Sequence, residues 1–286
     1  MLLCERRLCT LQYNKDLHLC MTTLAAWVSV DSEKHSACYL VSDSRISWAN
    51  GHWDAGQKLF VSNRYPDVFG YSGDVQFPTL ALRQVIDRMD LGLLFASDAD
   101  SVLRHNTILA ELQTASRDYP AHPTSSSTIL HFSREGVGKN ARFRLWKLEW
   151  SRDSAIKSTS LALPTDSVIG ETAGSGWKTL IHRNDSWKRA QGRTARGIFS
   201  SFCDALESEE DPGSSGPPQL VGLYPSFASR MFGVVWRHNR YLAGKLVPDS
   251  AQFDQLEWRN SLFERLNPWT LQRLEGAQPQ PRPRGL

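Results

Sequence analysis

The order of strand-like and helix-like segments constrains the fold of this chain more than any single motif does. Alternating or short buried apolar runs predict strands at residues 25–30, 37–41, 58–61, 67–71, 127–132, 142–150, 166–169, 219–223, 232–237 and 240–246. Helical spacing of apolar residues predicts helices at residues 78–89, 98–117, 175–184 and 186–206. Strands, two helices, strands, two helices and strands again is not a parallel βαβ alternation. The pattern therefore predicts an α+β layered fold.

The first two strands predict a β-hairpin that follows two threonines. Residues 25–30 and 37–41 are separated by a polar stretch, which predicts a loop of five or six residues. Thr22 and Thr23 come directly before the first strand, and Met21 comes directly before Thr22. We expect Thr22 to lie where this strand begins, at an edge of a sheet.

Thr22 becomes chemically distinctive if Met21 is removed. A hydroxyl is a poor nucleophile until a base takes its proton, and an α-amino group, with a pKa of about 7.7–8.0, is a suitable base near neutral pH. An N-terminal Thr22 would carry both groups on one residue, an arrangement used in covalent catalysis. The sequence therefore favours acyl transfer as the reaction class.

Composition excludes several other classes of function. The chain has 286 residues, of which 41% are hydrophobic and 22% are charged, as in ordinary globular proteins. Its net charge of +3 is spread along the chain, so we expect no nucleic-acid partner. It contains neither a transmembrane stretch nor the apolar run of a signal peptide, so we expect no membrane partner and a cytoplasmic location. No motif indicates a cofactor or a metal site.

Two segments differ from the rest of the chain. Residues 1–21 hold three of the five cysteines without the paired spacing of a zinc site, and we interpret them as a propeptide or an upstream extension, including one produced by a mis-assigned start codon. Residues 251–286 form a C-terminal extension with a Pro-rich tail, in which residues 258–274 are compatible with an added helix. The tail and the Gly-, Ser- and Pro-rich residues 207–218 are predicted to be irregular.

The element order and three short motifs resemble the proteasome β-subunit family, including its bacterial relatives that act as compartment-forming peptidases. The motifs are the leading Thr22, the Asp43 of Ser-Asp-Ser-Arg after the hairpin, and the Lys58 of Gly-Gln-Lys. The resemblance runs from Thr22 to roughly Leu246 and places a hydrolase domain at residues 22–250. It implies the N-terminal nucleophile hydrolase fold, a four-layer α-β-β-α sandwich of two mainly antiparallel sheets.

The resemblance also implies roles for individual residues. Lys58 would act electrostatically on the Thr22 hydroxyl, Asp43 would orient Lys58, and the backbone N–H of Gly73 would contribute to an oxyanion hole. Ser175, in a Gly-Ser-Gly turn, would reach the amine of residue one.

Three further assignments follow from the resemblance. Asp166 or Thr172 are alternatives to Ser175, and the sequence does not choose between them. Ser47 would lie on the strand that holds an extended substrate by backbone pairing, and Tyr71 would line the substrate's side-chain pocket.

These expectations define a threonine-type peptidase that forms an acyl-enzyme at Thr22. By resemblance, identical subunits would assemble into a ring or a related self-compartmentalising oligomer that degrades polypeptides, with an ATP-dependent unfoldase as an optional partner. Two alternatives remain open, a small-amide hydrolase on the same fold and a catalytically silent scaffold subunit. The joint presence of Thr22, Asp43 and Lys58 argues against the silent subunit.

Overall fold

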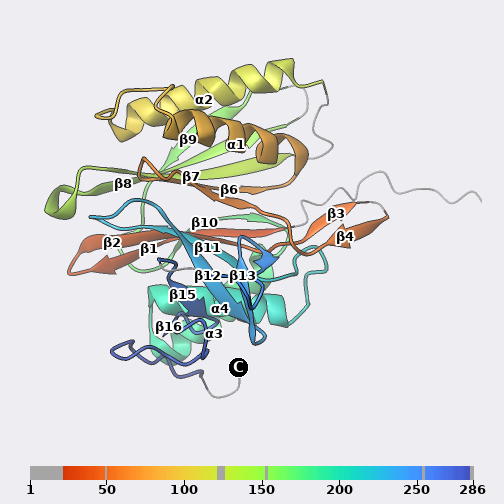
Figure 1. Cartoon of the computed structure of the whole chain (residues 1–286), viewed down its shortest axis with the longest axis vertical. Coiled ribbons are helices and arrows are strands. Elements are labelled where there is room, and N and C mark those ends of the chain that lie inside the picture. The colour runs from red at the N-terminus through yellow and green to blue at the C-terminus, as the bar shows by residue number, and fades with distance from the viewer. Residues whose placement is uncertain (1–21, 49, 121–125, 152–153, 253–254, 284–286) are drawn as a thin grey trace, which may run out of the picture.

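The computed structural model describes residues 22–48, 50–120, 126–151, 154–252 and 255–283. Figure 1 shows a mixed arrangement of helices and antiparallel sheets, which confirms the α+β class expected from the sequence. The predicted leader at residues 1–21 lies outside the described residues. None of the helices that the structure describes combines the length and apolar character needed to cross a bilayer.

The larger sheet joins strands from both ends of the chain. In the described residues its order is β10-β1-β2-β11-β12-β13-β14, and β15 and β16 extend it beside β12. The strands are β1 (Thr23–Asp31), β2 (Lys34–Ser42), β10 (Ile169–Gly174), β11 (Gln219–Leu223), β12 (Arg230–Trp236), β13 (Asn239–Leu242), β14 (Lys245–Leu246), β15 (Trp258–Asn260) and β16 (Arg265–Leu266).

The smaller sheet is formed by the middle of the chain. Its order is β5-β6-β7-β8-β9, with all neighbours antiparallel. The strands are β5 (Leu59–Val61), β6 (Asp67–Ser72), β7 (Ser127–Glu135), β8 (Arg142–Trp150) and β9 (Lys157–Leu161), with a short 3₁₀ turn at Gly138–Asn140. A separate two-stranded ribbon pairs β3 (Ile46–Trp48) with β4 (Gly51–Trp53).

The helices pack in pairs, one pair against each sheet. The first pair, α1 (Gln76–Asp90) and α2 (Ser101–Asp118), shares an apolar cluster with the smaller sheet. The second pair, α3 (Trp177–Gln191) and α4 (Ala195–Glu207), shares another cluster with the larger sheet. A third cluster contains residues of both sheets, which face each other in Figure 1.

Strand β1 is apolar along most of its length because it is buried on both faces. Successive strand side chains point to opposite faces. Ala25 and Trp27 belong to the cluster with α4, whereas Leu24, Ala26 and Val28 belong to the cluster between the sheets. A strand buried on both faces has no polar alternation, so it reads as a continuous apolar run.

The first hairpin differs from its prediction in two ways. Its connection is a tight turn at Ser32 and Glu33, both with positive φ (47° and 66°), instead of a loop of five or six residues. Positive φ at both positions suits the twist of a two-residue hairpin turn. In addition, β1 does not lie at an edge of the sheet, because β10 and β2 flank it on its two sides.

Later boundaries were also predicted incorrectly. The strand expected at residues 166–169 starts only at Ile169 and runs to Gly174, so it covers residues 170–174, which had been assigned to neither a strand nor a helix. Helix α3 therefore begins at Trp177, and α4 begins after Thr194, whose hydroxyl accepts a hydrogen bond from the N–H of Gly197 at 3.0 Å. Polar and glycine residues hid the strand because its apolar pattern is weak.

The C-terminal extension contains no helix at residues 258–274, contrary to the prediction. Instead β15 pairs in parallel with β12, and the ring of Trp258 fills the space that a side chain on Gly233 would occupy. The Asn260 side-chain oxygen accepts hydrogen bonds from the N–H groups of Leu262 (3.0 Å) and Glu264 (2.8 Å), which favours a turn over a helix.

The described part of the Pro-rich tail contains no helix or strand, as predicted, but it is held against α4. Arg282 donates to the Asp204 carboxylate at 2.6 Å, and the Gln280 side chain donates to the Ser200 hydroxyl at 2.8 Å. The extension therefore packs on the domain as one of its outer elements.

A buried polar chain lies between α2 and the smaller sheet. The carboxylate of Asp67 accepts from Arg104 (2.8 Å) and is 2.9 Å from the Nε2 atom of His131. The Nδ1 atoms of His131 and His105 are 3.0 Å apart. Burial and the neighbouring His131 lower the pKa of His105 to about 3. His105 is therefore neutral in the folded protein at neutral pH.

This histidine makes the stability depend on pH. The unfolded chain protonates His105 near pH 6.5, whereas the folded chain does not, so the free energy of unfolding falls as the pH drops from about 6.5 toward about 3. We expect His105→Gln to lose less stability than the native chain between about pH 7.5 and about pH 5 in urea titrations. The exposed His238 provides the control His238→Gln, and equal pH slopes for native and His105→Gln would contradict the assignment.

Candidate active site

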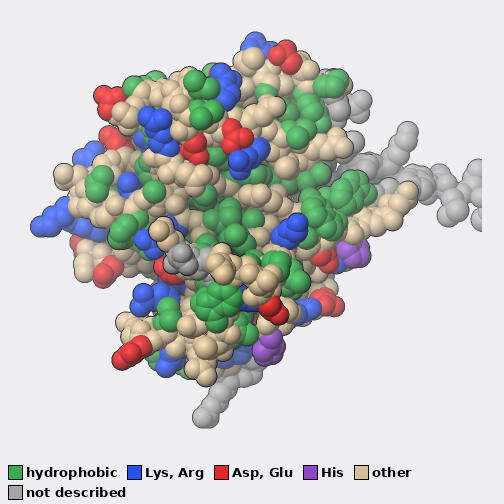
Figure 2. All heavy atoms as spheres, in the orientation of Figure 1, with side chains coloured by type: hydrophobic (Ala, Val, Ile, Leu, Met, Phe, Trp, Pro, Cys, Tyr) green, Lys and Arg blue, Asp and Glu red, His purple; other side chains and the backbone are tan. Residues whose placement is uncertain are grey.

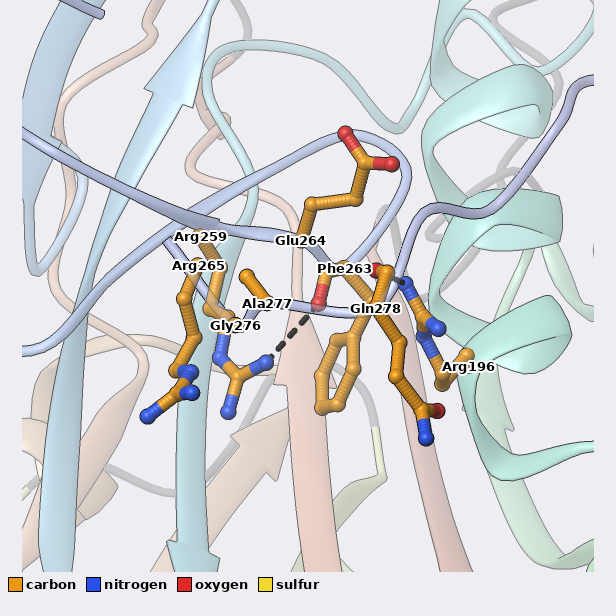
Figure 3. A pocket seen from close by; sticks show the side chains of 8 residues that line it. All are labelled: Arg196, Arg259, Phe263, Glu264, Arg265, Gly276, Ala277 and Gln278. Carbon is orange, nitrogen blue, oxygen red and sulfur yellow. Dashed lines mark hydrogen bonds between the residues drawn. The ribbon is translucent and has the colours of Figure 1, made fainter. Parts of the chain in front are cut away.

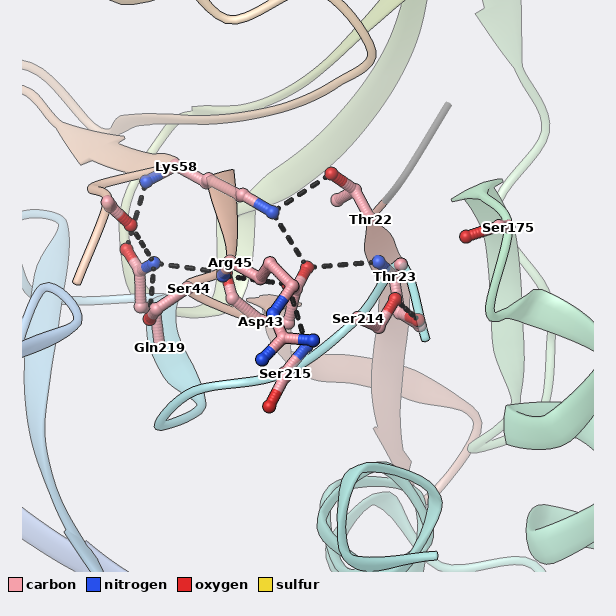
Figure 4. Close-up of polar contacts among 12 residues, drawn as sticks. Thr22, Thr23, Asp43, Ser44, Arg45, Lys58, Ser175, Ser214, Ser215 and Gln219 are labelled. Atoms are coloured by element: carbon pink, nitrogen blue, oxygen red, sulfur yellow. Dashed lines mark hydrogen bonds and ion pairs between the residues drawn. The ribbon is translucent and has the colours of Figure 1, made fainter. Parts of the chain in front are cut away.

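Thr22, Lys58 and Asp43 form one buried chain of polar contacts (Figure 4). The ammonium group of Lys58 donates to the Thr22 hydroxyl at 2.9 Å and to Asp43 Oδ1 at 2.9 Å. The three residues are at most 2% exposed. The structure thus brings together the three residues that carry the sequence prediction.

The first hairpin places Asp43 beside the start of β1. Leu24 pairs with Ser42, so the residue after β2 comes level with Thr23. The N–H of Thr23 donates to Asp43 Oδ1 at 3.0 Å, and the N–H of Asp43 donates to the carbonyl of Thr23 at 3.3 Å. The carboxylate is therefore fixed against the backbone that carries Thr22.

The Asp43 carboxylate accepts two more backbone hydrogen bonds. Oδ2 accepts from the N–H of Arg45 at 2.9 Å and from the N–H of Ser215 at 3.3 Å. Three backbone donors and one ammonium group thus surround a carboxylate that is 0% exposed. A buried charge of this kind is tolerated because its oxygens are paired.

Burial and pairing act in opposite directions on the two charged groups. Burial raises the pKa of Asp43, and Lys58 beside it offsets part of that effect. Burial lowers the pKa of Lys58, and Asp43 offsets part of that lowering. Lys58 is therefore easier to deprotonate than an exposed lysine, at a position where it contacts the Thr22 oxygen.

Gln219 holds the backbone around Lys58. Its side-chain oxygen accepts from the N–H of Lys58 at 3.0 Å, and its side-chain nitrogen donates to the carbonyls of Asp43 (3.1 Å) and Gly56 (2.7 Å). Gln219 is the first residue of β11, far along the sequence. It was missed at the sequence level because a lone glutamine at a strand start carries no recognisable pattern.

Ser175 lies between two glycines that approach Thr22. A Cβ atom on Gly174 would come within 1.9 Å of the Thr22 carbonyl oxygen, and the N–H of Gly176 donates to that oxygen at 3.4 Å. Gly174 also adopts a positive φ of 92°, which side-chain-bearing residues rarely adopt. The two glycines allow this turn to come close to the start of β1.

A second polar cluster adjoins the first and includes two residues that the sequence analysis did not single out. The Asp211 Oδ2 atom accepts from Ser175 at 2.8 Å and from Ser214 at 2.6 Å, and the Ser214 and Thr23 hydroxyls are 2.7 Å apart. Asp211 and Ser214 belong to residues 207–218, which were predicted to be irregular. The segment is a loop, but it is tied to the site. In the sequence of this loop, only the run Asp211-Pro-Gly-Ser214 could have suggested a role in the site.

The alternatives to Ser175 lie elsewhere. The carboxylate of Asp166 pairs with Arg193 at 2.6 Å, where both side chains are more than half exposed. Thr172 pairs with Ala25 inside the sheet. Of the three candidates, only Ser175 belongs to the polar cluster beside Thr22 and Thr23.

Gly73 lies at the end of β6 with a φ of 105°. The N–H of Tyr71 donates to the carbonyl of Lys58 at 3.2 Å, so Gly73 comes two residues after a direct neighbour of the lysine. This position is consistent with an oxyanion donor near Thr22, and the role stays a prediction.

Ser47 and Tyr71 occupy different surroundings. Ser47 is on β3, whose partner among the described residues is β4, and its buried hydroxyl has no hydrogen-bond partner there. Tyr71 is 1% exposed within the core of α1 and the smaller sheet, where its hydroxyl accepts from Thr79 at 2.9 Å. Their substrate contacts stay predictions.

No three His, Cys, Asp or Glu side chains converge as a metal site within the part of the chain that the structure describes. No model of a known protein family matches the chain, and a search of curated proteins finds no similar sequence.

The buried ion pair gives a prediction for stability. Lys58→Met removes the cation and leaves the Asp43 carboxylate buried without its charged partner. We expect the free energy of unfolding in urea to fall by about 3–5 kcal/mol at neutral pH. Lys34→Met, at an exposed position on β2, is the matched control. A loss below about 1 kcal/mol for Lys58→Met would contradict the prediction, because exposed surface ion pairs contribute no more than that.

Proposed function

We propose that this protein is a threonine-type N-terminal nucleophile peptidase with the four-layer α-β-β-α fold of that superfamily. The observation that carries the proposal is the buried contact of the Thr22 hydroxyl with Lys58, itself paired with Asp43. A lysine held at 2.9 Å from a threonine oxygen stabilises negative charge that develops on it. The packing of a helix pair on each of two facing sheets supports the fold assignment.

The proposed reaction requires prior hydrolysis of the peptide bond between Met21 and Thr22, which frees the α-amine of Thr22. The freed α-amine of Thr22 takes the hydroxyl proton while Oγ1 attacks the peptide carbonyl, and the resulting oxyanion is stabilised by the N–H of Gly73. The amine returns the proton to the leaving nitrogen, and water then hydrolyses the ester at Thr22. Ser175, Asp211 and Ser214 position the backbone and the amine.

Substrate binding follows from the ribbon beside the site. Ser47 lies on β3, whose outer edge offers backbone groups to an extended polypeptide. We propose polypeptides as substrates on this basis. A small-amide hydrolase is the second candidate, and it would cleave short amides faster than peptides.

Assembly into a homo-oligomer is part of the proposal. Trp48 and Trp53 are 55% and 53% exposed on the β3–β4 ribbon, where Figure 2 shows apolar side chains gathered at the surface. Leu80, Leu91 and Leu93, in and after α1, are 59–72% exposed. Exposed apolar side chains in such numbers favour contact with other subunits.

The proposal leaves an ATP-dependent unfoldase as an optional partner. It also includes a cytoplasmic location, which the buried free thiols of Cys38 and Cys203 fit.

The nucleophile is tested by substitution at Thr22. We expect Thr22→Ala to lower cleavage of a fluorogenic peptide library by about a thousandfold or more, and Thr22→Ser to keep part of the activity. Thr159→Ala, at an exposed position on β9, is the control.

Covalent capture separates the candidate functions. A threonine-directed electrophile should add one adduct that peptide mapping places on Thr22. Cleavage of small amides but not peptides would favour the amidohydrolase. An intact native chain with neither activity nor adduct would favour the silent scaffold and contradict the proposal.

A further inference from the structure

A second site lies far along the chain from the Thr22 cluster, between α4 and the C-terminal extension. A cavity of about 320 Å³ opens there, lined by Arg196, Arg259, Phe263, Glu264, Arg265 and Gln278 together with small residues. Figure 3 shows the side chains of Arg259 and Arg265 running side by side. The volume falls at the lower end of the range for small-molecule sites, about 300–1,000 Å³.

The acidic groups near this cavity already have partners. Arg259 pairs with Glu257, and its guanidinium also donates to the carbonyl of Phe263 at 2.8 Å. The Glu264 carboxylate accepts from the N–H of Gln280 at 2.7 Å and from the Asn260 side chain at 2.9 Å. In Figure 3 the Glu264 side chain points away from the arginines. The Nη1 atom of Arg273 lies 3.6 Å from Oε1 of Glu264, so Arg273 balances the negative charge of Glu264.

Two guanidinium groups make no hydrogen bond or ion pair with a carboxylate among the described residues. Arg196 donates to the backbone carbonyls of Gln278 (2.8 Å) and Pro279 (3.4 Å), which carry no net charge. The exposed side chain of Arg265 has no hydrogen-bond or ion-pair partner among the described residues. Burial lowers the pKa of Arg196, the negative charge of Glu264 offsets part of this lowering, and the positive charges of Arg259 and Arg273 add to it. The cavity therefore carries about two uncompensated positive charges.

We propose that this cavity binds the phosphate group of a small molecule. A phosphate offers three or four oxygens and up to two negative charges, which match two guanidinium groups better than a single carboxylate does. The partly enclosed cavity also has an apolar wall at Phe263, which a phosphate ester could contact with its organic part. The binding uses no residue of the Thr22 site and stands independently of the peptidase proposal.

The test is isothermal titration calorimetry on the full-length protein at constant ionic strength. The probes are inorganic phosphate, adenosine monophosphate and citrate. We expect saturable binding of at least one phosphate probe and an affinity reduced by about tenfold or more in Arg265→Gln and in Arg196→Gln. Tighter binding of adenosine monophosphate would identify an ester as the ligand, and equal binding would identify free phosphate.

Arg142→Gln provides the control, because it removes one exposed arginine from β8 and changes the net charge equally. The exposed Arg265 keeps the test decisive if Arg196→Gln fails to fold. Absence of saturable phosphate binding, tighter binding of citrate, or equal losses in Arg142→Gln and Arg265→Gln would each overturn the proposal.

Discussion

The buried ion pair between Lys58 and Asp43 is the constraint on which the rest of this site depends. Two opposite charges removed from water are tolerated only if nearly every oxygen and N–H between them is paired. Here the carboxylate is held by three backbone N–H groups, and the ammonium divides its donors between Asp43 and Thr22. Burying this pair costs free energy of desolvation. Under the proposed function, that cost keeps a cation next to the Thr22 oxygen, where negative charge would develop.

The fold supplies these contacts from five separate segments, and the segment just before β5 supplies Lys58. The β1–β2 hairpin sets Asp43 against Thr23, β11 supplies Gln219, and the turn before α3 brings Ser175 beside Thr22. The loop after α4 adds Asp211, which joins Ser175 to the Thr23 side. The hairpin and β11 are fixed by sheet pairing, and the loop after α4 is tied to Ser175 and Thr23 by hydrogen bonds, so the fold itself holds the polar cluster in place.

The sequence predicted the parts of this arrangement that have strong local patterns. Apolar runs located β1, β2, β8 and β11, and the helical spacing of α1 and α2 was close to the observed limits. Thr22, Asp43 and Lys58 were identified from short motifs in the right order. The sequence did not predict Gln219, Asp211 and Ser214, because their roles arise only when distant segments meet. The strand β15 was missed because a tryptophan packing on Gly233 leaves no periodic signal.

The most direct measurement for the central claim is the N-terminal residue of the protein purified from its native host, determined by intact mass and N-terminal sequencing. The account predicts a chain that begins at Thr22, because only a free α-amine there provides the base that the hydroxyl requires. A native chain in which Thr22 remains joined to Met21 would have that nitrogen in a peptide bond. That result would contradict the nucleophile assignment and leave the Lys58–Asp43 pair with a structural role alone.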